Sequence, residues 1–378
     1  MNPITDVNPI EQMLVDRAAG MHLPIACTLE LTPLCNFNCR MCYVRLSGEE
    51  LRGRGRLLSG SEWLRIAEQM KTAGVLFVLL TGGEPLTHPD FREIYRGLIS
   101  MGMIVSVNTN GSLIDEEWAD FFGENRPRRV NITLYGANEE TYEKLCRAKG
   151  QFDKVLRGIK LLKERGVAVK MSGSLVPENE AQTGVLLDIS ERLDVPVNIT
   201  AYMYPVTRER GRAYDEAARL SPEAAADRRF EILLRECKGA PGGTLLQLER
   251  MLALVRPHEP AADGHYPMRC RAGRSAAAVS WQGKMRPCVM LPYPEEDVLS
   301  DGFGNAWRKL TEAAAAINTA SKCGTCEYRE LCPVCAAAAL AEEGACDKAP
   351  GYLCRYTRHY MDRIRKNVKE MSGHEDKP

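Results

Sequence analysis

The first indication of chemistry in this chain is a run of three closely spaced cysteines, Cys35, Cys39 and Cys42. They follow an expected strand at 26–32, so all three thiols lie in a loop at the carboxyl end of a strand. Loops at this end carry the active sites of β/α barrels. A structural zinc site needs four ligands, and neither His22 nor His88 is well placed to complete one. Three thiolates instead leave one iron of a cubane cluster open, so the run predicts an iron–sulfur cluster that binds a further ligand.

The remaining cysteines indicate a second metal region. The chain has 14 cysteines, more than a core of this size uses as small apolar residues, and a reducing compartment argues against disulfides. Three stand alone, and of these we expect Cys27 and Cys146 to be structural. Two Cys-x2-Cys pairs have the spacing of a zinc ribbon, but a ribbon leaves cysteines at both ends of the region unexplained. The region contains eight cysteines: Cys270, Cys288, Cys323, Cys326, Cys332, Cys335, Cys346 and Cys354.

Composition excludes several classes of partner. The 378 residues include 50 Lys and Arg against 50 Asp and Glu, and this balance gives no basic footprint for nucleic acid or an anionic membrane. The longest apolar runs, such as 75–80, are far shorter than the roughly 20 residues of a membrane span. Residues 1–21 lack the apolar centre of a signal peptide. We therefore expect a cytoplasmic protein of two or three domains, with no nucleic acid and no membrane partner.

Short apolar strands alternate with amphipathic helices in the first half of the chain. Ser59 and Glu62 have the pattern of a capping box, the helix that follows has apolar residues at helical spacing, and Gly74 ends it. Such alternation is typical of a parallel sheet with crossover helices. The fold class is therefore α/β, a partial (β/α)6 TIM-like barrel followed by a small cysteine-rich iron–sulfur domain. The predicted strands lie at 26–32, 75–80, 103–107, 130–134, 167–171 and 195–201.

The first cysteine run resembles the hallmark of radical S-adenosylmethionine enzymes, Cys-x3-Cys-x2-Cys after the first strand of a partial barrel. The likeness covers roughly residues 25–205. The family usually has an aromatic residue just before the third cysteine. This chain has Met41 at that position and Tyr43 after the cysteine. Residues 82–85 are similar to the family's Gly-Gly-Glu-Pro segment, which binds the methionine ammonium. The resemblance implies a four-iron cluster whose fourth iron is chelated by S-adenosylmethionine, and reductive cleavage of that cofactor to a 5′-deoxyadenosyl radical.

The resemblance also implies which residues contact S-adenosylmethionine. Polar residues end the later strands, and by position in the family's fold Thr133 would contact the ribose and Arg147 the carboxylate. A plain surface position is the alternative for Arg147. No residue is assigned a catalytic role. The predicted cofactor-binding residues are Gly82, Gly83, Glu84, Pro85, Asn110, Thr133, Arg147 and Ser172.

The C-terminal cysteines resemble the SPASM extension of this family, in which seven cysteines hold two auxiliary four-iron clusters. By that resemblance one auxiliary cluster binds Cys270, Cys288 and Cys335. The family's further cysteine upstream of Cys270 is missing, and the Cys332–Cys335 spacing is one residue shorter than usual. The fourth ligand of this cluster stays undecided between an open iron, His265 or Asp263, and Cys346. The other auxiliary cluster is assigned to Cys323, Cys326, Cys332 and Cys354.

These patterns divide the chain into five segments and predict three 4Fe–4S clusters in all. Pro and Gly breaks at 240–243 and 257–264 place the main domain boundary near residue 260. The segments are an N-terminal segment at 1–24, the radical S-adenosylmethionine partial barrel at 25–205, a helical connector at 206–262, the SPASM domain at 263–370 and a disordered tail at 371–378.

Because many SPASM proteins modify ribosomally made peptides, the resemblance implies hydrogen abstraction from a peptide or protein, giving a crosslink, thioether, epimer or oxidised product. A radical dehydrogenase or decarboxylase of a small molecule is the alternative. An iron–sulfur carrier without turnover is disfavoured, because the cysteine run and residues 82–85 are both retained. An external flavodoxin or ferredoxin is the expected electron donor. Residues 1–24 are too few for the leader-binding domain of many maturases, so we expect a separate leader-binding protein.

Overall fold

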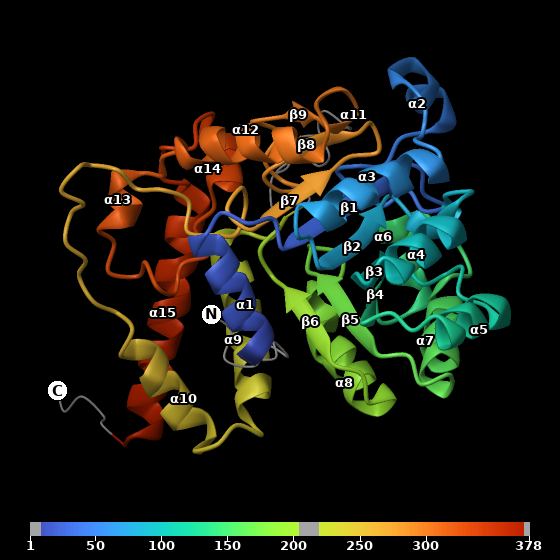
Figure 1. Ribbon diagram of the computed structural model, residues 1–378. Helices are drawn as coiled ribbons and strands as arrows, with labels where there is room; N and C mark the ends of the chain where they lie inside the picture. Colours follow the sequence, from blue (N-terminus) through green and yellow to red (C-terminus); the bar gives the residue numbers. More distant parts are fainter. Residues whose placement is uncertain (1–8, 204–218, 374–378) are drawn as a thin grey trace.

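Six parallel strands form the central sheet of the computed structural model, which describes residues 9–203 and 219–373 (Figure 1). They pair in sequence order from β1 to β6, so the predicted α/β partial barrel is confirmed. Their bounds are β1 Ala26–Thr32, β2 Phe77–Gly82, β3 Ile104–Thr109, β4 Arg129–Thr133, β5 Val169–Ser174 and β6 Val197–Thr200.

Three strands begin two residues later than their apolar runs predicted, for one shared reason. The backbone N–H of Val75, Val167 and Val195 each bonds back to the preceding helix, to Met70 O, Leu162 O and Ser190 O at 2.9 to 3.1 Å. The first apolar residue of each run therefore closes the helix rather than opening the strand. These valines are buried at the point where each helix meets the following strand.

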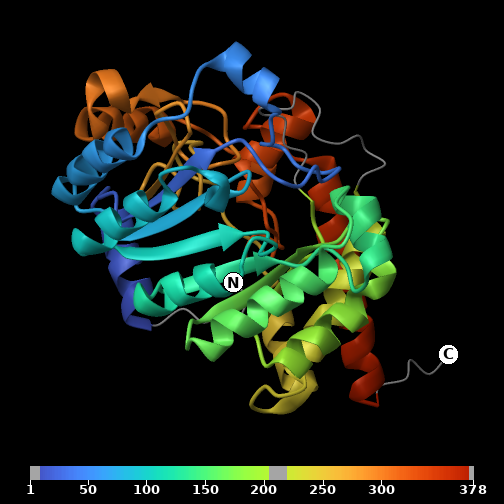
Figure 2. The same ribbon diagram turned by 90° about the vertical axis from the view of Figure 1, so that its right-hand side faces the viewer.

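Helices cover the outer face of the sheet (Figure 2). Alternate strand residues such as Leu29, Leu80 and Met171 are completely buried beneath them. The Ser59 capping box is confirmed: Glu62 N donates to Ser59 Oγ at 3.3 Å, and Ser59 N donates to Glu62 Oε2 at 2.8 Å. The barrel helices are α3 Gly60–Thr72, α4 Phe91–Ser100, α5 Glu116–Glu124, α6 Glu139–Cys146, α7 Phe152–Glu164 and α8 Thr183–Leu193, with short 3-10 turns η1 Pro85–Thr87 and η2 Glu180–Gln182.

The cysteine-rich region extends the same sheet. β7 (Ala276–Val279) pairs in parallel with β1, and β8 (Lys284–Arg286) and β9 (Glu296–Asp297) continue it antiparallel, which gives nine strands within the described residues. The predicted boundary near residue 260 falls before β7, yet the sheet runs across it without a break. The helices of this region are α11 Val298–Asp301, α12 Phe303–Ala315, α13 Ser321–Gly324, α14 Ala336–Glu343 and α15 Gly351–Met371.

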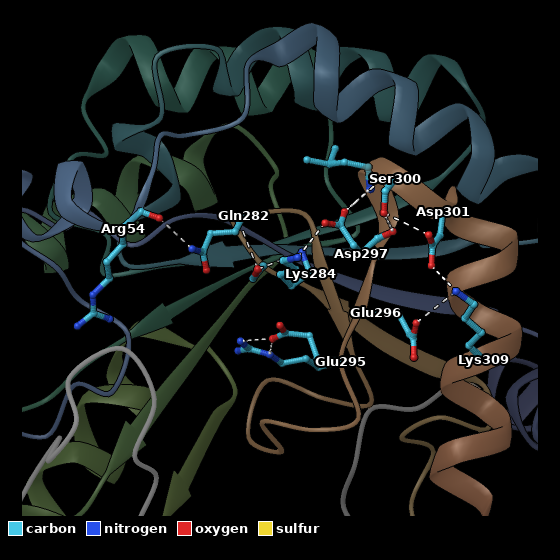
Figure 3. Close-up of polar contacts among 12 residues, drawn as sticks. Arg54, Gln282, Lys284, Glu295, Glu296, Asp297, Ser300, Asp301 and Lys309 are labelled. Atoms are coloured by element: carbon cyan, nitrogen blue, oxygen red, sulfur yellow. Dashed lines mark hydrogen bonds and ion pairs between the residues drawn. The ribbon is translucent and has the colours of Figure 1, made fainter.

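Polar contacts fasten this extension to the barrel. Gln282 Nε2 donates to Arg54 O at 3.2 Å (Figure 3). Phe303 N donates to Gln69 Oε1 on α3 at 2.7 Å. Within the extension, Lys284 forms an ion pair with Asp297 at 2.8 Å, beside the start of α11 (Figure 3). The extension is therefore part of the barrel's framework.

Two helices lie in the described part of the connector. α9 (Pro222–Cys237) lies beside the long helix α15, and α10 (Gly243–Leu252) follows it (Figure 1). Further helices are α1 Pro9–Gly20 and α2 Gly48–Arg54. Most of the predicted disordered tail, 374–378, lies outside the described residues, as does the connector's beginning up to residue 218. Across residues 9–203 and 219–373, the helices are all too short or too polar to cross a membrane.

A chain truncated after residue 262 should be largely insoluble. Removing β7 exposes the backbone edge of β1, and removing α15 uncovers the apolar face of α9, so both surfaces become available for aggregation. The measurement is the soluble fraction and elution volume on size exclusion. A chain ending at residue 373 is the control, and a monodisperse, soluble 1–262 fragment would show that the barrel folds independently.

Candidate active site

The three cysteines of the first run lie in the loop after β1, as the sequence predicts. Cys39 is buried, and the other two are half-buried. Backbone N–H groups approach two sulfurs: Phe37 N lies 3.3 Å from Cys35 Sγ, and Arg45 N lies 3.3 Å from Cys42 Sγ. Such donors stabilise sulfur when it carries negative charge, as in a ligated thiolate.

Burial in this pocket disfavours the thiolate form of Cys35. Burial raises the pKa of Cys35 to about 12, and the charges of Glu84, Cys39 and Cys42 act in the same direction. Thiolate ligation therefore needs positive charge at the same place, which the irons of a cluster supply. The residues present fit a cluster held by this loop.

The cysteine loop is fixed to the end of α6. Asn38 N donates to Cys146 O at 3.0 Å, and Arg40 N donates to Leu145 O at 3.1 Å. The next residue, Arg147, ends the helix in the left-handed region at φ 51°, which is uncommon for a side chain without a local hydrogen-bonding group. Arg147 is therefore held beside the cysteine loop, although the sequence places it far along the chain. Cys146 is fully buried, in agreement with a structural role.

Gly82 and Gly83 allow two loops to touch. A Cβ on Gly82 would lie 2.3 Å from Thr32 O, and a Cβ on Gly83 would lie 2.3 Å from Leu34 O. Gly83 N donates to Thr32 O at 2.7 Å, and Glu84 N donates to Leu34 O at 2.8 Å. The resemblance to the Gly-Gly-Glu-Pro segment implies that this loop binds a ligand. The structure gives the two glycines a further role, because their missing side chains let the β2 loop pack against the backbone that leads into Cys35.

Glu84 is completely buried and joins the loops after β2 and β3. Its Oε1 accepts from Leu86 N at 3.1 Å and from Thr109 Oγ1 at 2.8 Å, while Oε2 accepts from Asn110 N at 2.7 Å. Burial raises the pKa of Glu84 to about 7, and the three hydrogen bonds act against that rise. The carboxylate therefore organises the site, whether or not it also meets a ligand.

Asn110 extends this network to the cysteine loop. Its Nδ2 donates to Asn36 Oδ1 at 2.8 Å and lies 3.8 Å from Cys35 Sγ, while its Oδ1 accepts from Ser112 N at 2.9 Å. Asn36 and Ser112 were missed by the sequence analysis. Their only sequence signal is that each lies within two residues of a predicted site residue.

The inner face of the sheet is polar. Thr133 and Ser172 are register partners on β4 and β5, and both are half-buried. One step below them Asn131 is paired with Lys170, and Asn131 Nδ2 donates to Asn108 Oδ1 at 2.8 Å. Asn131 also lines a cavity on this face. The inside of the barrel can therefore hydrogen-bond a polar ligand or substrate group.

The C-terminal cysteines lie near one another in two groups. Burial raises the pKa of Cys288 to about 11, and Cys335 and Cys270 add to this rise. Cys335 thus lies with these two cysteines rather than in a ribbon with its neighbour Cys332. The other group lines a single hollow together with Lys322 and Arg358, and its members are Cys323, Cys326, Cys332 and Cys354.

The second group also has a hydrogen-bond donor. Thr357 Oγ1 lies 3.3 Å from Cys332 Sγ, and burial raises the pKa of Cys332 to about 11 against the effect of this contact. Among the described residues, no three Cys, His, Asp or Glu side chains are grouped tightly enough to hold a single metal ion.

Comparison with known proteins agrees with this geometry. Residues 29–188 match the family model described as the Radical SAM superfamily. Mycofactocin maturase MftC of Mycobacterium tuberculosis is 29% identical over 332 residues, which are 86% of this chain and 81% of that protein. The AdoMet-dependent heme synthase of Methanosarcina barkeri is 26% identical over 328 residues, 83% of this chain and 92% of that protein.

Solved structures share the fold. Native anSMEcpe with bound AdoMet has a TM-score of 0.69 at 16% identity and covers 93% of this chain and 99% of its own. Streptococcus suis SuiB bound to its precursor peptide SuiA has a TM-score of 0.66 at 16% identity and covers 94% of this chain and 83% of its own. At this identity the likeness establishes the fold alone.

Gly83→Ala should lower the iron content of the purified protein while leaving its secondary structure intact. The added Cβ would meet Leu34 O at 2.3 Å, a backbone atom that can yield only by displacing the loop into Cys35. Iron per chain and circular dichroism measure the two effects. Gly239→Ala is the control, because a Cβ there meets nothing within 4 Å. Wild-type iron content in Gly83→Ala would contradict the packing argument.

Proposed function

We propose that this chain, which has a radical S-adenosylmethionine domain at residues 29–188, cleaves S-adenosylmethionine reductively and abstracts hydrogen from a peptide substrate. The observation that carries the proposal is the cysteine loop at the carboxyl end of β1, with the loops of Gly82–Glu84 and Asn110 packed against it. When bound, a four-iron cluster supplies the electron that breaks the sulfonium bond and releases methionine and the 5′-deoxyadenosyl radical.

The chain's own residues bind and orient the cofactor in this proposal. Cys35, Cys39 and Cys42 hold the cluster, and the Gly82–Pro85 loop binds the methionine ammonium. Arg147 binds the methionine carboxylate: its side chain is exposed beside the cysteine loop and has no ion-pair partner among the described residues. Thr133, Ser172 and Asn110 bind the rest of the cofactor from the polar ends of three strands.

A peptide is the substrate that the relatives favour. The names of MftC and of the Bacillus subtilis protein AlbA, 25% identical over 289 residues, refer to a mycofactocin maturase and to subtilosin bacteriocin biosynthesis. SuiB has been solved with its precursor peptide. Crosslinking, thioether formation, epimerisation and oxidation all begin with loss of one hydrogen atom from a side chain or Cα, so each is compatible with this start.

A small-molecule substrate is the second candidate, and the likeness to an AdoMet-dependent heme synthase favours it. Turnover with a uniformly deuterated candidate precursor peptide separates the two. Deuterium in 5′-deoxyadenosine, measured by mass spectrometry, supports peptide chemistry. Cofactor cleavage stimulated by an iron porphyrin but not by the peptide would favour the second candidate.

We also propose that the C-terminal cysteines hold two auxiliary four-iron clusters and that a flavodoxin or ferredoxin supplies electrons. The two groups of cysteines support this assignment, because each is gathered from segments distant in sequence and each contains sulfurs that burial keeps protonated in the absence of iron.

Replacing Cys35, Cys39 and Cys42 together by Ala should abolish 5′-deoxyadenosine formation, because the loop then lacks its cluster ligands. The variant should keep the iron of the C-terminal cysteines. Chromatography of the nucleoside product and iron analysis give the two readings, with a Cys27→Ala variant as control for cysteine removal. Cleavage at the wild-type rate in the triple variant would reject the mechanism.

Arg147→Gln should raise the dissociation constant of S-adenosylmethionine about tenfold, the effect of losing one charge-assisted hydrogen bond of about 1.4 kcal/mol. Calorimetric titration of the reconstituted protein measures it. Arg157→Gln is the matched control, since Arg157 is an exposed helix residue paired with Glu116. Equal affinity in the two variants would show that Arg147 is a surface residue.

A further inference from the structure

We propose that Cys346 is the fourth ligand of the first auxiliary cluster, so that four thiolates close this site around a 4Fe–4S cluster. The inference rests on the proposed function in one respect, the assignment of Cys270, Cys288 and Cys335 as ligands of that cluster. The proposal selects Cys346 from the candidate fourth ligands that the sequence leaves undecided.

Cys346 packs in the same small apolar cluster as two of these ligands. Cys288, Cys335 and Cys346 are partly buried around a common set of completely or nearly completely buried side chains. That set consists of Met268, Leu291, Ala314, Ala336 and Ala337. The three cysteines therefore pack against one apolar region from three segments, after β8, before α14 and after α14.

The path of the chain returns Cys346 toward this region. Cys335 immediately precedes α14, and Gly344 ends that short helix in the left-handed region at φ 75°, which turns the chain back. The loop that carries Cys346 is held at its far end, because Gly351 N donates to Glu343 Oε1 at 3.1 Å.

The alternative ligands are directed elsewhere. His265 lines a separate cavity with His22 and Thr311, and no cysteine lines it. Asp263 Oδ1 already accepts a hydrogen bond from His265 N at 2.9 Å. Cys237 is buried in α9, where its charged neighbours are Glu236 and Arg229 rather than another cysteine. Cys346 is therefore the candidate that packs in the same apolar cluster as two of the three ligands, Cys288 and Cys335.

A closed site has a chemical consequence. With four thiolates bound, no iron of this cluster is free for a substrate thiolate, so the cluster would transfer electrons rather than bind substrate. Cys346, from a different part of the chain, would also replace the cysteine that the family usually has upstream of Cys270.

The test uses the full chain in which Cys35, Cys39 and Cys42 are replaced by Ala, so that only auxiliary iron remains. This parent should hold about eight irons, two clusters of four. Adding Cys346→Ala should lower the count by about four, or leave a labile cluster with an altered electron paramagnetic resonance spectrum. Cys346→Ser, which retains an oxygen ligand of similar size, should keep more iron and show a shifted spectrum.

Cys237→Ala in the same background is the matched control for loss of a buried cysteine, and circular dichroism checks the fold of each variant. Iron content and spectrum identical to the parent in Cys346→Ala would overturn the proposal and favour the open site. Failure of the proposed function gives a different result: the parent would then hold no iron, or the chain with its first three cysteines intact would form no 5′-deoxyadenosine.

Discussion

The geometry of the active-site end depends on one buried carboxylate. Glu84 accepts hydrogen bonds from Leu86 N, Thr109 Oγ1 and Asn110 N, and Asn110 in turn holds Asn36 beside Cys35. Hydrogen bonds to a charged acceptor contribute about 1.5–3 kcal/mol each, more than those between neutral groups. Desolvation of the same carboxylate opposes this gain, as its pKa near 7 indicates. Glu84 thus organises three loops at a cost in electrostatic free energy. These loops carry the residues predicted to bind the cluster and the cofactor.

The three cysteine groups share a second constraint, which is that burial opposes thiolate formation. The pKa of Cys35 reaches about 12, and that of Cys323 and of Cys332 about 11, with burial as the largest cause each time. In the proposed function, iron would displace protons from these thiols when a cluster is built, and the free energy of ligation would be coupled to the order of the loops. The cysteine-rich region has irregular stretches between β7 and α15, which this coupling would help to order.

The sequence predicted the barrel well because the spacing of apolar residues and helix capping are both local properties of the chain. The capping box at Ser59 and the apolar repeats located the helices, and the largest shifts in strand starts occurred where a valine closed the preceding helix. β7 was missed, since Ala276–Val279 is short and its pairing with β1 joins segments about 250 positions apart. The contact of Gly83 with Leu34 was missed for the same reason: sequence indicates that glycine is needed, but not which backbone approaches it.

The parallel pairing of β7 with β1 also fixes where the first auxiliary cysteines lie relative to the cysteine loop. Ala276 pairs with Ala26 at the start of β1, and β8 returns antiparallel, so Cys270 before β7 and Cys288 after β8 both flank the amino ends of these strands. The cysteine loop follows the carboxyl end of β1. Seven residues of strand, at about 3.3 Å each, separate the two edges by roughly 20 Å. In the proposed function, a substrate atom beside the cysteine loop is therefore out of reach of this auxiliary group.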